Sequence, residues 1–352
     1  AGNGDHQGSG RVGGDGVMAK LGEVCLLKAG KFVSANDISP EYNKGLYPCF
    51  GGNGIRGYVA DYTHDGEFPL IGRQGALCGN VNLASGKFHA TEHAVVVQPK
   101  IEMNVHWLYY ALNAMNLGQY ATGAAQPGLA VSKLETLSIE IPNISEQNKI
   151  AQTLYKVEQL VNFRKQQLAK LDELVKARFV EMFGDPVSNP MGWKRVRFDS
   201  ISENLDSKRV PVTESDRKDG VYPYYGASGI VDWINDYIFD EDILLVSEDG
   251  ANLLMRSTPI AFSVSGKSWV NNHAHVVRFH DFATQKFIEV YFSLIDISEY
   301  ITGTAQPKLN QAKLNTMLFC WPPLSLQKQF AAFVERVDQQ KQTVQQSLEK
   351  LE

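Results

Sequence analysis

The chain has 352 residues, enough for two domains that each bury a core of their own. Its formal net charge of -5 excludes a uniformly basic coat for nucleic acid but is compatible with local basic faces. The four cysteines stand singly without metal-binding or redox spacing, and no signal-peptide pattern or long apolar span occurs. This pattern predicts core thiols and a reducing cytoplasm.

The first segment in chain order is a glycine-rich leader. Residues 1–17 hold seven glycines and show no apolar periodicity. We therefore expect an added or disordered leader ahead of Met18 that takes no part in the fold.

Residues 18–143 are predicted to form a first globular domain of mixed α and β structure. Short β-rich runs bounded by Gly, Asn and Asp, such as HAVVVQP, come first, and an amphipathic helix follows them. The segment TGAAQPGL then leads to a short strand, LSIEIP, which a proline ends.

Residues 144–183 predict a long exposed helix with one apolar stripe. The stripe follows alternating steps of four and three, the spacing of a coiled-coil seam, at Ile150, Leu154, Val157, Val161, Leu168, Leu171 and Val175. Arg164 and Arg178 interrupt the seam and either fix its register or extend their charged ends to solvent. Gly184 and two Asx-Pro steps then predict a linker over residues 184–192.

The second half of the chain repeats the first. GKSWVNNHAHVV from Gly266 matches GKFHATEHAVVV from Gly86 at a separation of 180 residues, and YPYYGASGIVDW matches YPCFGGNGIRGY at a separation of 175. The difference of five residues lies between Ala76 and Gly86, where we expect a surface loop. Residues 193–323 are thus predicted to form a second domain of the same kind, and residues 324–352 a second helix.

The second helix carries the same apolar stripe as the first. Its seam is predicted at Phe330, Val334, Val337, Val344, Leu348 and Leu351, with Lys341 as an interruption. A stripe this narrow is rarely stable alone, so we expect the two helices to pair antiparallel and to separate two domains in a pseudo-twofold arrangement. At about 1.5 Å per residue the arms span roughly 55 and 40 Å, and the length that they share is comparable to one turn of duplex DNA, about 34 Å. Such a pair could serve as a ruler.

The repeated strings resemble the specificity subunit of type I restriction-modification systems from about Met18 to Glu352. Three further strings share the resemblance, namely TGTAQPKLNQAKLNTM, WPPLSLQKQ and RFVEMFGDPVSNPMGW. The resemblance implies an α+β chain with two target-recognition domains, each reading one half of a split DNA site. It implies no catalysis and no cofactor in this chain. The implied partners are double-stranded DNA, two methyltransferase subunits that use S-adenosylmethionine for adenine-N6 methylation, and two restriction subunits that use ATP and Mg. No membrane is implied.

Base readout needs Arg, Lys, Asn, Gln or acidic side chains on loops, with other polar groups on phosphates. Loops that vary between the copies offer such candidates at Asn53, Arg56, Arg73, Gln74, Asn80, Asn82, Lys87 and His89 in the first domain, and at Ser228, Trp233, Glu248, Asn252, Arg256, Lys267, Asn271 and Asn272 in the second.

Other interpretations remain open at this point. His93 and His273 suit a framework role, since no second metal ligand recurs at a matching separation. Gln126-Pro127 and Gln306-Pro307 either contact a partner or fix a loop. A protein scaffold with duplicated partner-binding domains is the alternative function, whereas a stand-alone enzyme would need a pocket with converging titratable groups in each half. The sequence shows no cofactor loop and no nuclease cluster.

Overall fold

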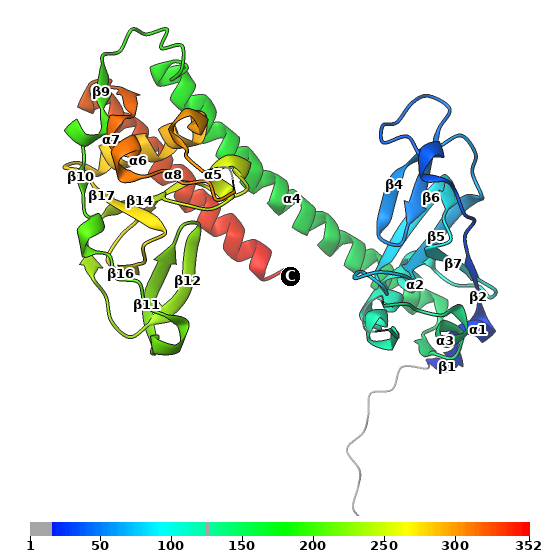
Figure 1. The fold of residues 1–352 in the computed structure, drawn as a ribbon. Coiled ribbons are helices and arrows are strands. Elements are labelled where there is room, and N and C mark those ends of the chain that lie inside the picture. Colours follow the sequence, from blue (N-terminus) through cyan, green and yellow to red (C-terminus); the bar gives the residue numbers. More distant parts are fainter. Residues whose placement is uncertain (1–15, 124–126, 304) are drawn as a thin grey trace, which may run out of the picture. The chain divides into compact units, whose positions relative to one another are not determined.

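Figure 1 shows a computed structural model of the chain, which describes residues 16–123, 127–303 and 305–352. The chain divides into two compact units, the first ending at Leu160 and the second beginning at Val161. The boundary falls inside one long helix, α4 (Ile144–Phe183), whose bounds are those predicted from the sequence. Among the described residues no helix combines the length and apolarity needed to cross a membrane.

The first unit contains a six-stranded sheet in the order β2-β7-β5-β6-β3-β4 and a two-stranded ribbon of β1 and β8. Its strands are β1 (Val17–Lys20), β2 (Cys25–Ala29), β3 (Tyr47–Gly51), β4 (Gly54–Val59), β5 (His64–Gly72), β6 (Val81–Ala90), β7 (Ala94–Pro99) and β8 (Ser138–Ile141). Its helices besides the first part of α4 are α1 (Leu21–Val24), α2 (Val105–Ala114), α3 (Val131–Glu135) and the 3-10 turns η1 (Ala35–Asp37) and η2 (Leu117–Tyr120).

The second unit contains two four-stranded sheets, β10-β17-β14-β15 and β12-β11-β16-β13, and a ribbon of β18 and β9. Its strands are β9 (Arg195–Arg197), β10 (Glu203–Asn204), β11 (Asp219–Gly226), β12 (Gly229–Ile234), β13 (Phe239–Asp240), β14 (Ile243–Ser247), β15 (Ala261–Val264), β16 (Lys267–Val270), β17 (Ala274–Arg278) and β18 (Leu318–Cys320). Its helices are α5 (Asn252–Met255), α6 (Phe282–Leu294), α7 (Gln311–Thr316), α8 (Leu324–Glu349) and the 3-10 turns η3 (Phe198–Ser200), η4 (Asp206–Lys208), η5 (Glu214–Asp216) and η6 (Ser298–Tyr300).

The two units have the same plan, as the repeat predicts. The single strand β6 corresponds to β15 and β16 together, because Gly86 and Gly266 both lie at a corner with φ of +73° and +75°, a conformation that favours glycine. Eight residues (73–80) join β5 to β6 and thirteen (248–260) join β14 to β15. The difference, 13 - 8 = 5, is the predicted five-residue insertion, and it contains α5.

Strand β14 is buried on both faces, which explains its uninterrupted apolar run. Leu244 and Val246 point into the core formed with α6, whereas Ile243 and Leu245 point into a second core with Phe239. In the first unit α2 covers one face in the same way. All four cysteines are buried and free, as predicted.

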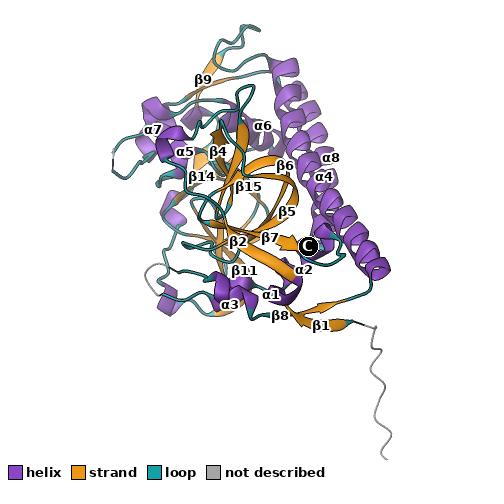
Figure 2. Ribbon diagram, turned by 90° about the vertical axis from the view of Figure 1, so that its right-hand side faces the viewer, coloured by secondary structure: helices purple, strands orange, loops and turns teal. Residues whose placement is uncertain are grey.

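The α4–α8 pair is antiparallel, as predicted, over the part of α4 that belongs to the second unit. Lys165 of α4 pairs with Glu352 just beyond α8 (2.8 Å), and Asp172 pairs with Lys341 (2.5 Å), so the numbering falls along one helix as it rises along the other. Leu171 and Val175 of α4 share one core with four predicted seam residues of α8, namely Phe330, Val334, Val337 and Val344. Figure 2 shows the two helices side by side.

Two expectations need correction. Val17 pairs with Ile141 in the β1–β8 ribbon, so the boundary of the leader at residue 17 is wrong; residues 1–15 lie outside the described part of the chain. The continuous seam is also wrong at Leu154, which is 39% exposed. Leu154 belongs to the first unit, whereas α8 packs on the part of α4 that belongs to the second unit. Ile150, by contrast, packs against the core of the first unit.

Candidate nucleic-acid interface

Three loops of the second unit meet at one end of its sheet and are joined by backbone hydrogen bonds. The amide of Glu248 donates to the carbonyl of His273 (2.9 Å), and the amide of Leu309 donates to the carbonyl of Glu248 (2.8 Å). The amide of Gly250 donates to the carbonyl of Pro307 in the repeated Gln-Pro segment (3.0 Å). We call this three-bond arrangement the loop frame.

The first unit has the same loop frame. The amide of Arg73 donates to the carbonyl of His93 (3.0 Å), that of Leu129 to the carbonyl of Arg73 (2.9 Å), and that of Gly75 to the carbonyl of Pro127 (3.0 Å). The Gln-Pro segments therefore fix a loop through their prolines, which supports that reading of them; Gln126 itself lies outside the described residues. The backbone carbonyls of His93 and His273 belong to the frame, whereas their rings lie beside Glu92 and Asp249, so a framework role of the side chains stays a prediction.

Side chains on the loop frame differ between the two units. Arg73 and Gln74 in the first unit stand where Glu248 and Asp249 stand in the second. The backbone bonds of the frame do not depend on side-chain identity, so the same geometry presents different hydrogen-bonding groups. An open cavity of about 590 Å³ adjoins the frame of the second unit, lined in part by Ser228, Asp249, Asn271, Asn272 and His273.

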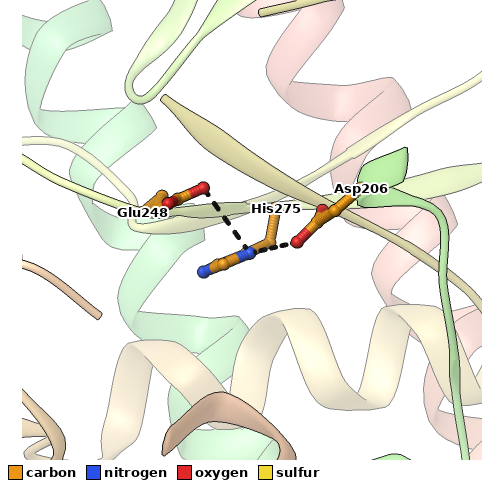
Figure 3. Close-up of side chains that lie close together, drawn as sticks. All are labelled: Asp206, Glu248 and His275. Carbon is orange, nitrogen blue, oxygen red and sulfur yellow. Dashed lines mark hydrogen bonds and ion pairs between the residues drawn. The ribbon is translucent and has the colours of Figure 1, made fainter. Parts of the chain in front are cut away.

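Behind the frame of the second unit lies a buried charge network, which Figure 3 shows in part. The Nδ1 atom of His275 lies 2.6 Å from Oδ2 of Asp206, and its Nε2 atom lies 2.7 Å from the carbonyl oxygen of Leu309. Both ring nitrogens face acceptor oxygens, an arrangement in which a protonated ring would donate from each of them. Glu248 accepts from Arg209 (2.6 Å) and pairs with Lys308 (3.0 Å).

The charge network lowers the pKa values of its two carboxylates, Asp206 and Glu248. Burial alone would raise the pKa of Asp206, but the hydrogen bond and charge of His275 hold that pKa below its ordinary value of 3.8. Burial would also raise the pKa of Glu248, but the hydrogen bonds from Arg209 and Lys308 outweigh this effect and hold that pKa below its ordinary value of 4.5. Ligand atoms of Asp206, Glu248 and His275 lie within 4.8 Å of one another. Because Arg209 and Lys308 already balance the two carboxylates, we interpret the group as an ion-pair network and not as a metal site.

Several sequence-predicted residues lie on or beside the loop frame with accessible side chains. In the first unit the exposed Asn80 donates to Asn53 (2.7 Å), and Gln74 is exposed beside the half-buried Arg73. The remaining members with exposed or half-buried side chains are Arg56, Asn82, Ser228, Trp233 and Asn272. Trp233 lies on β12 and Arg56 on β4, so these two belong to the hairpin next to the frame and not to the frame itself.

Lys87 and Lys267 occupy the same position in both units, away from the frame. Each lies over an exposed tyrosine ring, Lys87 over Tyr62 at 4.7 Å and Lys267 over Tyr237 at 4.5 Å. Hydrogen bonding to Tyr62 raises the pKa of Lys87, and the neighbouring tyrosine hydroxyls raise the pKa of Lys267. Both side chains therefore carry a positive charge at the surface.

Five predicted contact residues are engaged within their own domain, which is a physical reason to remove them from the set of direct DNA contacts. Arg256 donates to the carbonyls of Phe292 and Ile295 at the end of α6, where burial lowers its pKa. The other four are His89, bonded to the carbonyl of Lys31; Glu248, in the charge network; Asn252, bonded to Ser257 and Thr258; and Asn271, bonded to the amide of His273.

Sequence reasoning missed two features. Asp249 was not selected, although its position in the repeat, opposite Gln74, could have identified it. A pair of buried glutamines was missed as well: Gln147 and Gln327 are 2% and 0% exposed, 180 residues apart, and both donate to a proline carbonyl at the end of the preceding strand, Pro142 and Pro322. Each of these bonds fixes the start of a long helix on its domain.

The comparisons with known proteins agree with this duplicated architecture. The model of the type I restriction modification DNA specificity domain matches the chain twice, at residues 15–173 and 190–352. The chain therefore belongs to this family and contains two copies of its domain.

Particular relatives match smaller parts. The specificity subunit of the type I restriction enzyme EcoprrI from Escherichia coli is 52% identical over 149 residues, which are 42% of this chain and 37% of that subunit. A putative type I specificity subunit from Haemophilus influenzae is 32% identical over 143 residues, 41% of this chain and 36% of that protein. These matches span little more than a third of either relative. The type I S subunit from Mycoplasma genitalium has the same fold, with a TM-score of 0.70 at 16% identity over 97% of this chain and 94% of that one.

Proposed function

We propose that this chain is the DNA-recognition subunit of a type I restriction-modification complex in which each domain reads one half of a bipartite site. The observation that carries the proposal is the loop frame, which is duplicated bond for bond while its outward side chains differ. Two readers of different sequences need a common scaffold and different hydrogen-bonding groups, and direct readout depends on those groups.

The proposed base-contact region comprises Asn53, Arg73, Gln74, Asn80, Asn82, Ser228 and Asn272, with Trp233 beside it. Arg56, Lys87 and Lys267 are proposed phosphate contacts, because exposed cations supply the sequence-independent part of binding. The chain itself does no chemistry in this proposal. Helices α4 and α8 set the unread gap and dock two methyltransferase subunits that carry S-adenosylmethionine, with two restriction subunits that use ATP and Mg in the full complex. The complex acts in the cytoplasm.

The test is a map of N6-methyladenine in the genome of cells that express this chain together with its methyltransferase partner. We expect a split motif with two specific halves and a gap of fixed length. If the assembled and active complex methylates without any motif, the recognition proposal fails, and the alternative of a protein scaffold with duplicated partner-binding domains takes its place. The recognition proposal also fails if the complex binds all duplexes with the same affinity at moderate salt, since phosphate contacts alone do not depend on sequence.

A further inference from the structure

His273 is held at three points, yet its ring is accessible. Its amide donates to Oδ1 of Asn271 (2.8 Å), its carbonyl accepts from the amide of Glu248 (2.9 Å), and its Nδ1 atom lies 2.9 and 3.0 Å from the two carboxylate oxygens of Asp249. The side chain is nevertheless 50% exposed. A polar group fixed this firmly loses little conformational entropy when it binds a ligand.

Asp249 determines which ring nitrogen faces outward. An ionised carboxylate only accepts hydrogen bonds, so Nδ1 of His273 carries the hydrogen between them. In the neutral ring the second nitrogen, Nε2, is then an acceptor. Within the described ranges no side chain or backbone group is bonded to Nε2 of His273, and the 590 Å³ cavity lies beside it.

The corresponding histidine of the first unit, His93, is paired with a carboxylate through its other ring nitrogen. Gln74 replaces Asp249, and the Nε2 atom of His93 lies 3.2 Å from Oε1 of Glu92. The nitrogen that is free in one copy is therefore occupied in the other. A framework role alone would need only the backbone carbonyl, which both histidines provide.

We propose that Nε2 of His273 reads one base of the second half-site by accepting a hydrogen bond from an exocyclic amino group. In the major groove this group belongs to adenine (N6) or cytosine (N4). Asp249 is the positioning residue that fixes the ring tautomer. This assignment rests on the proposed function, since it requires the second domain to lie on DNA.

The experiment uses the chain with its methyltransferase partner and compares the unaltered protein with H273A, D249N and H273Q. Genome-wide methylation maps give the motif, and competition binding of each purified complex to duplexes with single base-pair changes gives the discrimination at each position. The control is E214Q, a carboxylate-to-amide change like D249N at an exposed residue of η5.

We expect H273A to lose about tenfold or more in discrimination at one position of the second half-site. The first half-site and the gap stay unchanged. D249N acts at the same position but differently: the amide can donate to Nδ1, which moves the hydrogen to Nε2. The ring then donates where the unaltered ring accepts, so we expect the base pair preferred at that position to change. H273Q, which keeps a polar side chain, retains methylation with an altered base at that position, and E214Q changes nothing.

The inference is overturned if neither H273A nor D249N changes the base pair specified at any single position of the second half-site. It is also overturned if discrimination falls across the whole second half-site, which would indicate a structural role. Should H273A stop methylation in cells, the competition assay decides between these outcomes. Failure of the proposed function looks different, because the unaltered complex would then show no split motif at all.

Discussion

Gln327 offers a direct test of how each long helix is fixed to its domain. The side chain is fully buried, donates to the carbonyl of Pro322 (2.9 Å) and accepts from the hydroxyl of Thr284 on α6 (2.7 Å). Replacement by Leu leaves both partners buried without a hydrogen bond, at about 1–3 kcal/mol for each. The added apolar surface offsets part of this loss. We therefore expect Q327L to lower the free energy of unfolding of the second unit by about 2–4 kcal/mol.

Hydrogen exchange during urea denaturation, measured by mass spectrometry, reports on each unit separately. Exchange of α6 and of the first turns of α8 is expected to accelerate, while the sheet of the first unit keeps its protection. Q340L is the matched control, since Gln340 is an exposed glutamine on the same helix and such changes stay within about 0.5 kcal/mol. If Q327L behaves like Q340L, the reasoning on the two buried bonds is refuted.

Three further predictions concern the second unit and the spacer. F179A removes a buried ring that stacks on Phe287 at 5.1 Å, and we expect thermal unfolding to show a loss of about 3–5 kcal/mol, whereas a loss below about 1 kcal/mol would contradict the packing. Because the pKa values of Asp206 and Glu248 are depressed on folding, their stabilisation is present above the ordinary values of 3.8 and 4.5, respectively, and is lost as the pH falls through the lower folded values. A D206N/E248Q protein is expected to lose this part of the acid dependence in unfolding curves; an identical pH profile would refute the assignment. Removal of the facing heptads 168–174 and 341–347 should shorten the methylation gap by about 3 base pairs, at about 1.5 Å per residue and 3.4 Å per base pair, with both half-sites retained; an unchanged gap would exclude the ruler.

The parts of the fold that depend on local periodicity could be predicted. The bounds of α4, the helix end at Gly184 and the antiparallel course of α8 follow from a regular apolar stripe and a terminating glycine, whose φ is +77°. The repeat also located the five-residue insertion. The exposure of Leu154 could not be predicted, because the spacing within α4 does not show which part of its stripe packs on a partner helix.

Contacts between residues far apart in the sequence could not be predicted. His275 and Asp206 are 69 residues apart, and nothing in their local sequence indicates that their side chains are bonded to each other. In the sequence Gln327 resembles the many exposed polar residues of its helix. It is nevertheless fully buried, and its amide group is bonded to the carbonyl of Pro322 and the hydroxyl of Thr284. Residues selected for polarity in variable loops included Arg256 and Asn252 for the same reason: polarity does not distinguish a group that caps a helix or a loop from one that faces a ligand.

The duplicated frame suggests how one domain type can acquire two specificities. Backbone bonds such as those from Arg73 and Glu248 to the two histidine carbonyls survive an inversion of side-chain charge, because only amide and carbonyl groups form them. Frame positions such as Gln74 and Asp249 can therefore change without loss of the loop geometry. The charge network of Asp206, Arg209 and His275 is then a local consequence of placing an acid at position 248, since a half-buried carboxylate requires cations beside it. In the proposed function, stability and specificity are therefore carried by different atoms of the same loops.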